Sequence, residues 1–199
     1  MQVFKFNKLI AVLLLSIPIA VFSDEKIEQS KFFVENLGKE VVEKVSNVNL
    51  TENERNVNFR NLYLSSFDNY YISRFVLGRH WKRLDSKMKK QFVESFNNYI
   101  VATYAPKFKG WEGTFKAVDS LIENNYYNVK MNVLNKDGPT LKLMWKIYLD
   151  KNKKFKILDV NIDGVSMLVT QRAEFMSVIK NNPKGVIGLI EAMNKKTSG

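Results

Sequence analysis

Two hydrophobic spacings divide the chain, one typical of helices and one typical of strands. Up to Tyr104, apolar residues recur three and four positions apart, as on one face of a helix. From Phe115 to Ile162 they recur at every second position, as in strands with one buried face. After Ser166 the helical spacing returns. This order predicts an α+β domain in which helices precede and follow one antiparallel sheet.

The strand region is centred on residues 141–149, where an apolar face that carries Trp145 alternates with a mostly polar one. Four strands are predicted, at 115–122, 127–133, 141–149 and 155–162. In the last of them the alternation shifts between Ile157 and Leu158, which indicates a bulge or burial on both faces. We expect a four-stranded antiparallel, strongly curved sheet, with N- and C-terminal helices covering one face and enclosing an apolar cavity.

Capping residues and helix breakers mark the ends of the predicted helices. The helical spacing predicts segments at 25–47, 51–67, 68–78, 87–104, 166–180 and 184–193. Gly38 leaves open whether the first segment is one helix or two. Thr51 and Glu54 form a capping-box pattern, and Asp68 can cap the next helix. Asp85 or Ser86 can cap the helix that begins at 87.

The first residues have a different composition from the rest of the chain. Lys5 and Lys8 precede an apolar run and a small-residue site near Ser23, the three-part pattern of a secretory signal peptide. We therefore expect a signal peptide at 1–23 that is cleaved near Ser23/Asp24, one domain at 24–194 and a frayed tail at 195–199. The alternative is an uncleaved N-terminal anchor.

Composition narrows the classes of protein further. The chain has no Cys, which excludes disulfides, thiolate metal sites and a lipoprotein anchor. Its formal net charge is +11. In the cytoplasm such a charge would suggest nucleic acid as a partner, but export favours anionic lipid head groups or an acidic protein instead. We expect no nucleic-acid partner.

Candidate catalytic groups are few. His80 is the only histidine, and Arg79 beside it disfavours a bound cation. No Gly-rich phosphate loop is present. Asp159 and Asp163 could serve as a general acid and base in a cone-shaped fold, although Asp at such places more often caps turns. We expect no catalytic residues, no metal site and no cofactor.

Three segments, taken together, resemble a known family. They are Val76-Leu77-Gly78-Arg79-His80-Trp81; Gln91-Phe92 followed by Phe96 and Thr103-Tyr104-Ala105; and Asp159-Val160 followed by Gly164-Val165-Ser166, Arg172 and Phe175. Their order and spacing are similar to those of the MlaC or toluene-tolerance auxiliary family of periplasmic phospholipid-binding proteins. Thr170-Gln171-Arg172 stands where that family has Asn-Tyr-Arg.

The resemblance implies a function in lipid transport. A protein of this kind is a monomeric periplasmic carrier that moves glycerophospholipid between the outer membrane and an inner-membrane ABC transport complex, which maintains outer-membrane lipid asymmetry. The implied partners are the phospholipid, that complex, an outer-membrane lipoprotein complex and, transiently, the membrane itself. The bound phospholipid is cargo and not a cofactor, and the protein is not an enzyme.

Periodicity together with the resemblance predicts which residues line the lipid cavity. They are Phe75, Val76, Trp81, Phe92, Phe96, Tyr99, Ile100, Tyr104, Met131, Trp145, Ile147, Val160, Ile162, Val165 and Met167. Arg79, Lys82 and Arg83 are expected at its rim, where they would assist docking.

Two other functions fit the same pattern. One is a periplasmic interaction module with a filled core and a contact surface at 151–156. The other is an isomerase-like or hydrolase-like enzyme that uses Asp159, Asp163 and His80.

Overall fold

The structure, a computed structural model, describes residues 19–136 and 138–197. The helices are α1 (Ile19–Lys44), α2 (Glu52–Ser66), α3 (Asn69–Leu77), α4 (Ser86–Tyr104), α5 (Met167–Asn181) and α6 (Val186–Thr197), with 3-10 helices η1 (Gly78–Arg83) and η2 (Ala105–Phe108). The strands are β1 (Gly113–Glu123), β2 (Tyr126–Asn135), β3 (Leu141–Leu149), β4 (Phe155–Ile162) and β5 (Val165–Ser166). Most of the predicted signal peptide, 1–18, lies outside the described residues, so its cleavage stays a prediction.

In the described residues the sheet has five strands and not the four predicted. Its order is β1-β2-β3-β4-β5, with every neighbouring pair antiparallel, and the sheet is open. The additional strand, β5, turns back onto the end of β4 through Asp163 and Gly164, whose φ angles are 48° and 91°. Two residues are too few to produce an alternating pattern, so no sequence periodicity marks this strand.

The predicted irregularity in the fourth strand is confirmed as a β-bulge. Lys146 pairs with Asp159 and Ile147 pairs with Ile157, so Leu158 has no partner on β3. The Leu158 side chain is buried, and its backbone marks the point where the alternation of β4 shifts. β4 therefore directs two successive side chains, Ile157 and Leu158, into the protein interior.

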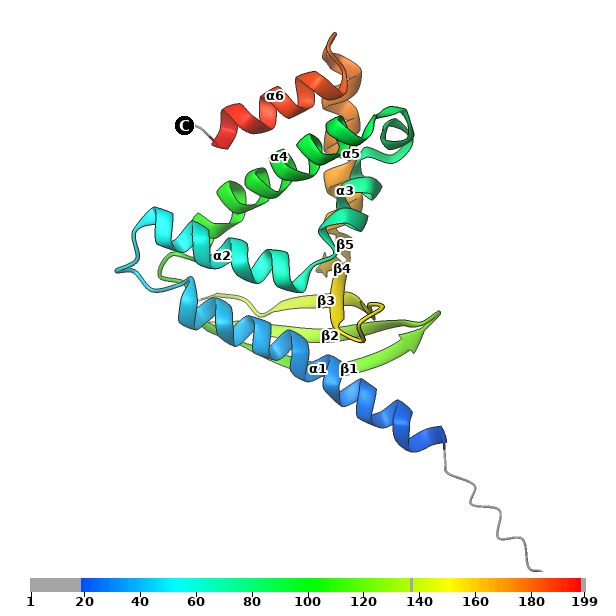
Figure 1. The fold of residues 1–199 in the computed structure, drawn as a ribbon. Helices are drawn as coiled ribbons and strands as arrows, with labels where there is room; N and C mark the ends of the chain where they lie inside the picture. Colours follow the sequence, from blue (N-terminus) through cyan, green and yellow to red (C-terminus); the bar gives the residue numbers. More distant parts are fainter. Residues whose placement is uncertain (1–18, 137, 198–199) are drawn as a thin grey trace, which may run out of the picture.

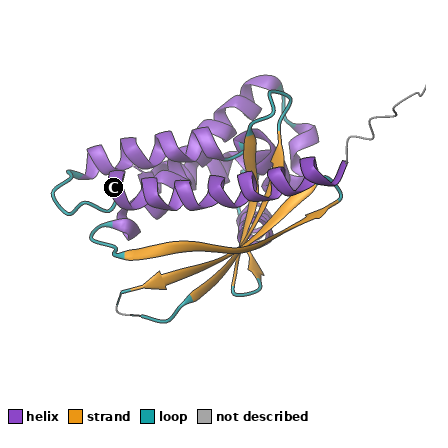
Figure 2. Ribbon diagram, turned by 90° about the horizontal axis from the view of Figure 1, so that it is seen from below, coloured by secondary structure: helices purple, strands orange, loops and turns teal. Residues whose placement is uncertain are grey.

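All the helices lie on one side of strands β1–β3 (Figures 1 and 2). α1 packs on β1 and β2, and the remaining helices form a layer above it. In that layer α3 packs on α5, and α4 packs on α6. Met144, on the uncovered face of β3, is exposed, whereas Trp145 on the covered face is buried. The predicted one-sided cover of the sheet is thus confirmed for the described residues.

Local capping signals place the helix starts as predicted. Thr51 and Glu54 form a complete capping box at α2. Asp68 accepts a hydrogen bond from Tyr71 N at 2.9 Å at the start of α3, and Asp85 accepts one from Met88 N at 2.7 Å at the start of α4. These caps orient three successive helices over the sheet.

The structure decides two points about the predicted helices, the continuity of α1 and the end of α6. α1 continues through Gly38 as one helix, which settles the alternative left open. α6 ends at Thr197, which is later than the predicted helix end at 193, and fraying of the tail stays a prediction. Lys184, just before α6, forms an ion pair with Glu191 on that helix at 2.8 Å.

Two separate clusters of buried apolar side chains stabilise the domain. One lies between α1, α2 and the sheet and includes Val34, Val45, Val129 and Ile147. The other lies among the helices of the upper layer and includes Phe92, Phe175 and Leu189. Since each cluster is packed within itself, the space between them is where a cavity can remain.

Candidate functional site

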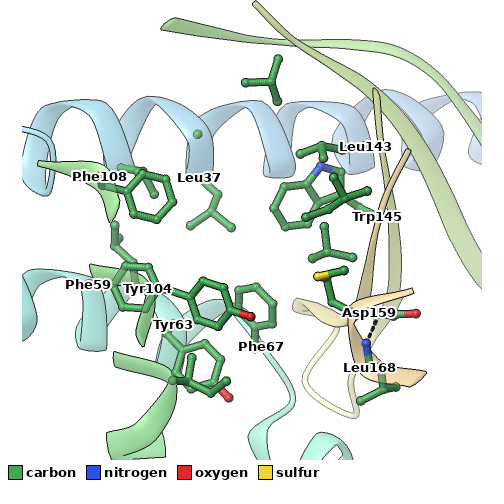
Figure 3. Close-up of a pocket in the computed structure, with 18 of the residues that line it drawn as sticks. Leu37, Phe59, Tyr63, Phe67, Tyr104, Phe108, Leu143, Trp145, Asp159 and Leu168 are labelled. Carbon is green, nitrogen blue, oxygen red and sulfur yellow. Dashed lines mark hydrogen bonds between the residues drawn. The ribbon is translucent and has the colours of Figure 1, made fainter. Parts of the chain in front are cut away.

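A cavity of about 360 Å³ lies between the two core clusters (Figure 3). Its walls come from α1, α2, α3, α4, η2, α5 and the covered face of the sheet. The lining residues are Leu37, Gly38, Val41, Phe59, Leu62, Tyr63, Phe67, Ile72, Val76, Phe96, Ile100, Tyr104, Phe108, Trp111, Phe115, Val133, Asn135, Leu141, Leu143, Trp145, Leu158, Asp159, Val160, Ile162, Met167, Leu168 and Gln171.

The cavity wall is apolar nearly throughout. Among the described residues that line it, Asp159 alone carries a charge. Its carboxylate accepts a hydrogen bond from Leu168 N at 3.0 Å and another from Ser166 Oγ at 2.5 Å. The Asp159 carboxylate therefore stabilises the start of α5 by accepting hydrogen bonds there. The rest of the wall is suited to a hydrophobic ligand.

Two tyrosines in the wall stay neutral. Burial raises the pKa of Tyr63 above its ordinary value, and burial also raises the pKa of Tyr104. The Tyr63 hydroxyl is buried without a hydrogen-bond partner, so it does not reach the open space of the cavity. Both rings act as apolar surface at neutral pH.

The exposure of the lining residues shows where the cavity opens. Residues of its floor, such as Val76, Phe96 and Leu158, are almost fully buried. Trp111 and Gln171 are only partly buried, as are the lining residues that begin β3. The wall therefore reaches the protein surface along the edge formed by the η2–β1 connection, the start of β3 and the first turns of α5, and this edge is called the mouth.

Eight of the residues predicted to line a cavity do so. They are Val76, Phe96, Ile100, Tyr104, Trp145, Val160, Ile162 and Met167. They come from α3, α4, α5, β3 and β4, five elements whose apolar faces converge on one space. Whether these side chains contact lipid stays a prediction.

The other seven lie elsewhere in the described structure, namely Phe75, Trp81, Phe92, Tyr99, Met131, Ile147 and Val165. Trp81 and Phe92 are buried within the helical core. Phe75 and Tyr99 pack against that core from outside. Met131 lies behind Trp145, whose Nε1 is 3.3 Å from the Met131 sulfur. Periodicity identified the apolar faces but not which part of each face borders empty space.

Ile147 and Val165 have different positions again. Ile147 is fully buried in the core between α1 and the sheet, under the α1 helix. Val165 is 53% exposed in β5 and belongs to the outer surface. Val165 was assigned to the wall from the periodicity and the family resemblance, whereas the structure places it on the short strand β5.

Sequence reasoning missed the contribution of α1, α2 and η2. Phe59, Tyr63 and Phe67 recur at intervals of four on α2 and the residue that follows it, and all three line the cavity. Figure 3 shows these three rings grouped near Phe108 and Tyr104. The interval of four was a usable signal for a helical face, although it does not say what that face borders.

The residues considered for catalysis have structural roles or lie elsewhere. Asp163 Oδ1 accepts a hydrogen bond from Lys142 N at 3.1 Å and holds the turn after β4. His80 lies on η1 and does not line the cavity. Its burial, with Arg79 and Arg83, lowers the pKa of His80, so it is neutral at pH 7. The part of the chain that the structure describes contains no cluster of three or more potential metal ligands.

The basic residues predicted at the rim lie apart from the mouth. Arg79, Lys82 and Arg83 are exposed on η1 and none of them lines the cavity. Within residues 19–136 and 138–197, no helix has the length and hydropathy needed to span a bilayer.

Comparison with known proteins shows a solved structure with a similar fold and a matching family model. The chain is similar to the phospholipid-binding protein from Ralstonia solanacearum, whose structure was solved in complex with a phospholipid, with a TM-score of 0.73 and 18% sequence identity. The match covers 84% of this chain and 96% of that chain, so the two proteins share a fold. No curated protein matches the chain significantly. The family model described as MlaC protein matches residues 35–195, and the chain therefore belongs to the MlaC family.

Proposed function

We propose that the protein binds a glycerophospholipid by its acyl chains and carries it across the periplasm. The observation that supports this most directly is the apolar cavity between the sheet and the helices. The phospholipid complex of the similar Ralstonia protein supports the same class of ligand. The lipid is cargo, so the function requires no cofactor and no catalytic residue.

The size of the cavity sets how much lipid it can hold. If a methylene group occupies roughly the 30 Å³ share of a water molecule, 360 Å³ accommodates about a dozen methylene groups. Removing that many from water is worth on the order of 10 kcal/mol before the costs of binding are subtracted. The cavity therefore has room for at least most of one acyl chain.

The proposed route runs between the outer membrane and an inner-membrane ABC transport complex. Membership of the MlaC family and the signal-peptide pattern at 1–23 support this route. Within it the chain acts as a monomeric carrier that contacts an outer-membrane lipoprotein complex, the ABC complex and, transiently, the membrane. Because escape of an acyl chain into water is slow, release requires one of these partners.

The rival functions have less support. An interaction module with a filled core does not account for a cavity of about 360 Å³. An enzyme built on Asp159 and Asp163 would have to release both carboxylates from the hydrogen bonds that hold the α5 start and the β4 turn.

Adjacent residues on β3 provide a matched test. Leu143 lines the cavity, whereas Met144 lies on the uncovered face and is 39% exposed. Leu143→Asp places a carboxylate in the apolar wall, and we expect it to abolish co-purification of phospholipid, measured by native mass spectrometry and organic extraction. Met144→Asp should retain the lipid. Wild-type protein that stays free of lipid after incubation with vesicles would overturn the proposal.

A further inference from the structure

A second, polar space adjoins the apolar cavity where β1 begins and β2 ends. This outer cup has a volume of about 430 Å³ and is lined by Gly110, Trp111, Glu112, Asn135, Lys136 and Gly138. Trp111 and Asn135 also line the apolar cavity. These two side chains are therefore part of the wall of both spaces, which lie next to each other.

Trp111 is fixed at this boundary. A side chain at Gly113 would collide with the indole, since an added Cβ would lie 2.6 Å from Trp111 Cζ2. The Phe115 ring contacts the indole from the cavity side at a centroid distance of 5.1 Å. The indole Nε1 donates a hydrogen bond to Asn135 Oδ1 at 3.0 Å. An indole with one apolar side and one polar edge suits the interfacial region of an amphipathic ligand.

Asn135 retains hydrogen-bonding capacity. Its Oδ1 accepts from Trp111, and its Nδ2 donates to Pro139 O at 2.8 Å. An amide NH₂ carries two donors, so one N–H of Asn135 has no acceptor among the described residues. Since Asn135 lines both the apolar cavity and the cup, this donor is available to an ester or phosphate oxygen of a lipid that occupies both spaces.

The cup carries one positive and one negative side chain. Lys136 and Glu112 form an ion pair, and each side chain is 64% exposed. The lysine is additionally held by its backbone, because Lys136 N donates to Glu112 O at 3.2 Å. The charges of Lys136 and Glu112 oppose each other, and so exposed a pair is easily exchanged for ligand groups.

We propose that the outer cup binds the zwitterionic head group of a glycerophospholipid, with Lys136 contacting the phosphate and Glu112 contacting the ammonium group. This inference rests on the proposed function. A head group with a phosphate and an ammonium satisfies both side chains at once. With an anionic head group that lacks the ammonium, Lys136 would contact the phosphate and Glu112 would have no cationic partner. The Glu112 carboxylate would then lie beside the negative charge of the phosphate.

Selectivity between head groups tests the proposal. The full chain is incubated with vesicles containing equal amounts of phosphatidylethanolamine and phosphatidylglycerol with the same acyl chains, and the bound lipids are quantified by native mass spectrometry. The wild type should favour phosphatidylethanolamine. Glu112→Gln should lower the bound ratio of phosphatidylethanolamine to phosphatidylglycerol about two- to five-fold, the range expected for an exposed charge pair.

Glu191→Gln is the matched control because it removes the acid of another exposed ion pair, with Lys184, far along the chain on α6. It should leave the ratio unchanged. A ratio that stays at the wild-type value in Glu112→Gln overturns the head-group assignment while lipid binding itself stands. A wild type that binds neither lipid overturns the proposed function instead.

The position of the head group gives a second measurement. Because the chain has no Cys, single photoreactive labels can be attached through Gly138→Cys in the cup, which leaves Lys136 and Glu112 in place, or through Val169→Cys on α5. Val169 is 57% exposed near Leu168, which Figure 3 shows at the opposite end of the cavity from Phe108. Phosphatidylethanolamine carrying an isotope in its head group should crosslink to the label at 138. Crosslinking mainly at 169 would place the head group at the α5 end and overturn the proposal.

Discussion

Gly38 on α1 packs directly against Phe115 on β1. An added Cβ at Gly38 would lie 2.3 Å from Phe115 Cγ and 2.7 Å from Phe115 Cβ, so rotation of the ring alone cannot relieve the contact. Both residues line the cavity. The glycine thus lets a continuous helix lie close to the edge of the sheet, and this approach sets one wall of the cavity.

Gly38→Ala tests this approach of helix to sheet. We expect the overpacking to outweigh the roughly 1 kcal/mol that alanine contributes to a helix, and the free energy of unfolding to fall by about 1–2 kcal/mol. Urea denaturation measures the change. Lys39→Ala, at the exposed neighbouring position, is the control and should be neutral or slightly stabilising. A more stable Gly38→Ala protein would show that α1 can move away from β1 freely.

Arg55 supplies a second testable contact. Its guanidinium, in a side chain only 3% exposed, donates to Val45 O at 3.0 Å, to Asn47 O at 2.6 Å and to Leu50 O at 3.4 Å. It thereby satisfies carbonyls in the connection between α1 and α2. Arg55→Met should lower the free energy of unfolding by about 2–4 kcal/mol, because these acceptors lose a charged donor. Arg79→Met, on the exposed surface of η1, should change it little.

The elements that sequence reasoning predicted correctly depend on local interactions. The Thr51 capping box, the Asp68 cap and the shift in alternation at Leu158 each involve residues a few positions apart. Such signals are readable because the interacting groups are neighbours in the chain. β5 was not predicted, because a strand of two residues forms only by pairing with β4 and leaves no pattern of its own in the sequence.

The candidate site was predictable in kind but only partly in its residues. Val76 on α3 and Trp81 on η1 are only five positions apart, yet Val76 borders the cavity and Trp81 is enclosed in the helical core. The difference depends on where α4 and α5 pack, which is set by contacts between distant segments. The cup at Trp111 and Asn135 likewise joins residues 24 positions apart.

Tyr148 on β3 forms a hydrogen bond with Asp68 at the start of α3. This contact should make the free energy of unfolding fall at alkaline pH. Burial, together with the hydrogen bond that its hydroxyl donates to Asp68, raises the pKa of Tyr148 to about 12. An unfolded tyrosine titrates near 10, so the neutral phenol stabilises the fold fully below about pH 10, and this contribution is lost as the pH rises towards 12.

Tyr148→Phe should therefore be less stable than the wild type by about 1 kcal/mol at pH 7, the value of a typical hydrogen bond. The difference should shrink as the pH rises from 10 to 12. Urea denaturation across that range measures it, and tyrosinate absorbance follows the ionisation. Tyr70→Phe removes a phenol that is 60% exposed, and its stability should follow the wild type at every pH. A constant gap between wild type and Tyr148→Phe would contradict the link between Tyr148 and Asp68.

The basic surface of η1 should act in docking and not in holding the lipid. Arg79, Lys82 and Arg83 are exposed and do not line the cavity, whereas the walls that would hold an acyl chain are uncharged apart from Asp159. Electrostatic attraction between exposed charges falls off within about 10 Å at 0.1 M salt, but hydrophobic burial is not screened. Docking and retention should therefore respond differently to salt.

Replacing Arg79, Lys82 and Arg83 together by Ala separates the two effects. Association with anionic vesicles, measured by co-sedimentation, should weaken in the variant, and in the wild type it should weaken as salt rises. The amount of phospholipid that co-purifies should stay the same in both proteins at every salt concentration, because acyl-chain burial holds it. Loss of lipid in parallel with loss of vesicle binding would mean that charge, and not the apolar cavity, retains the ligand.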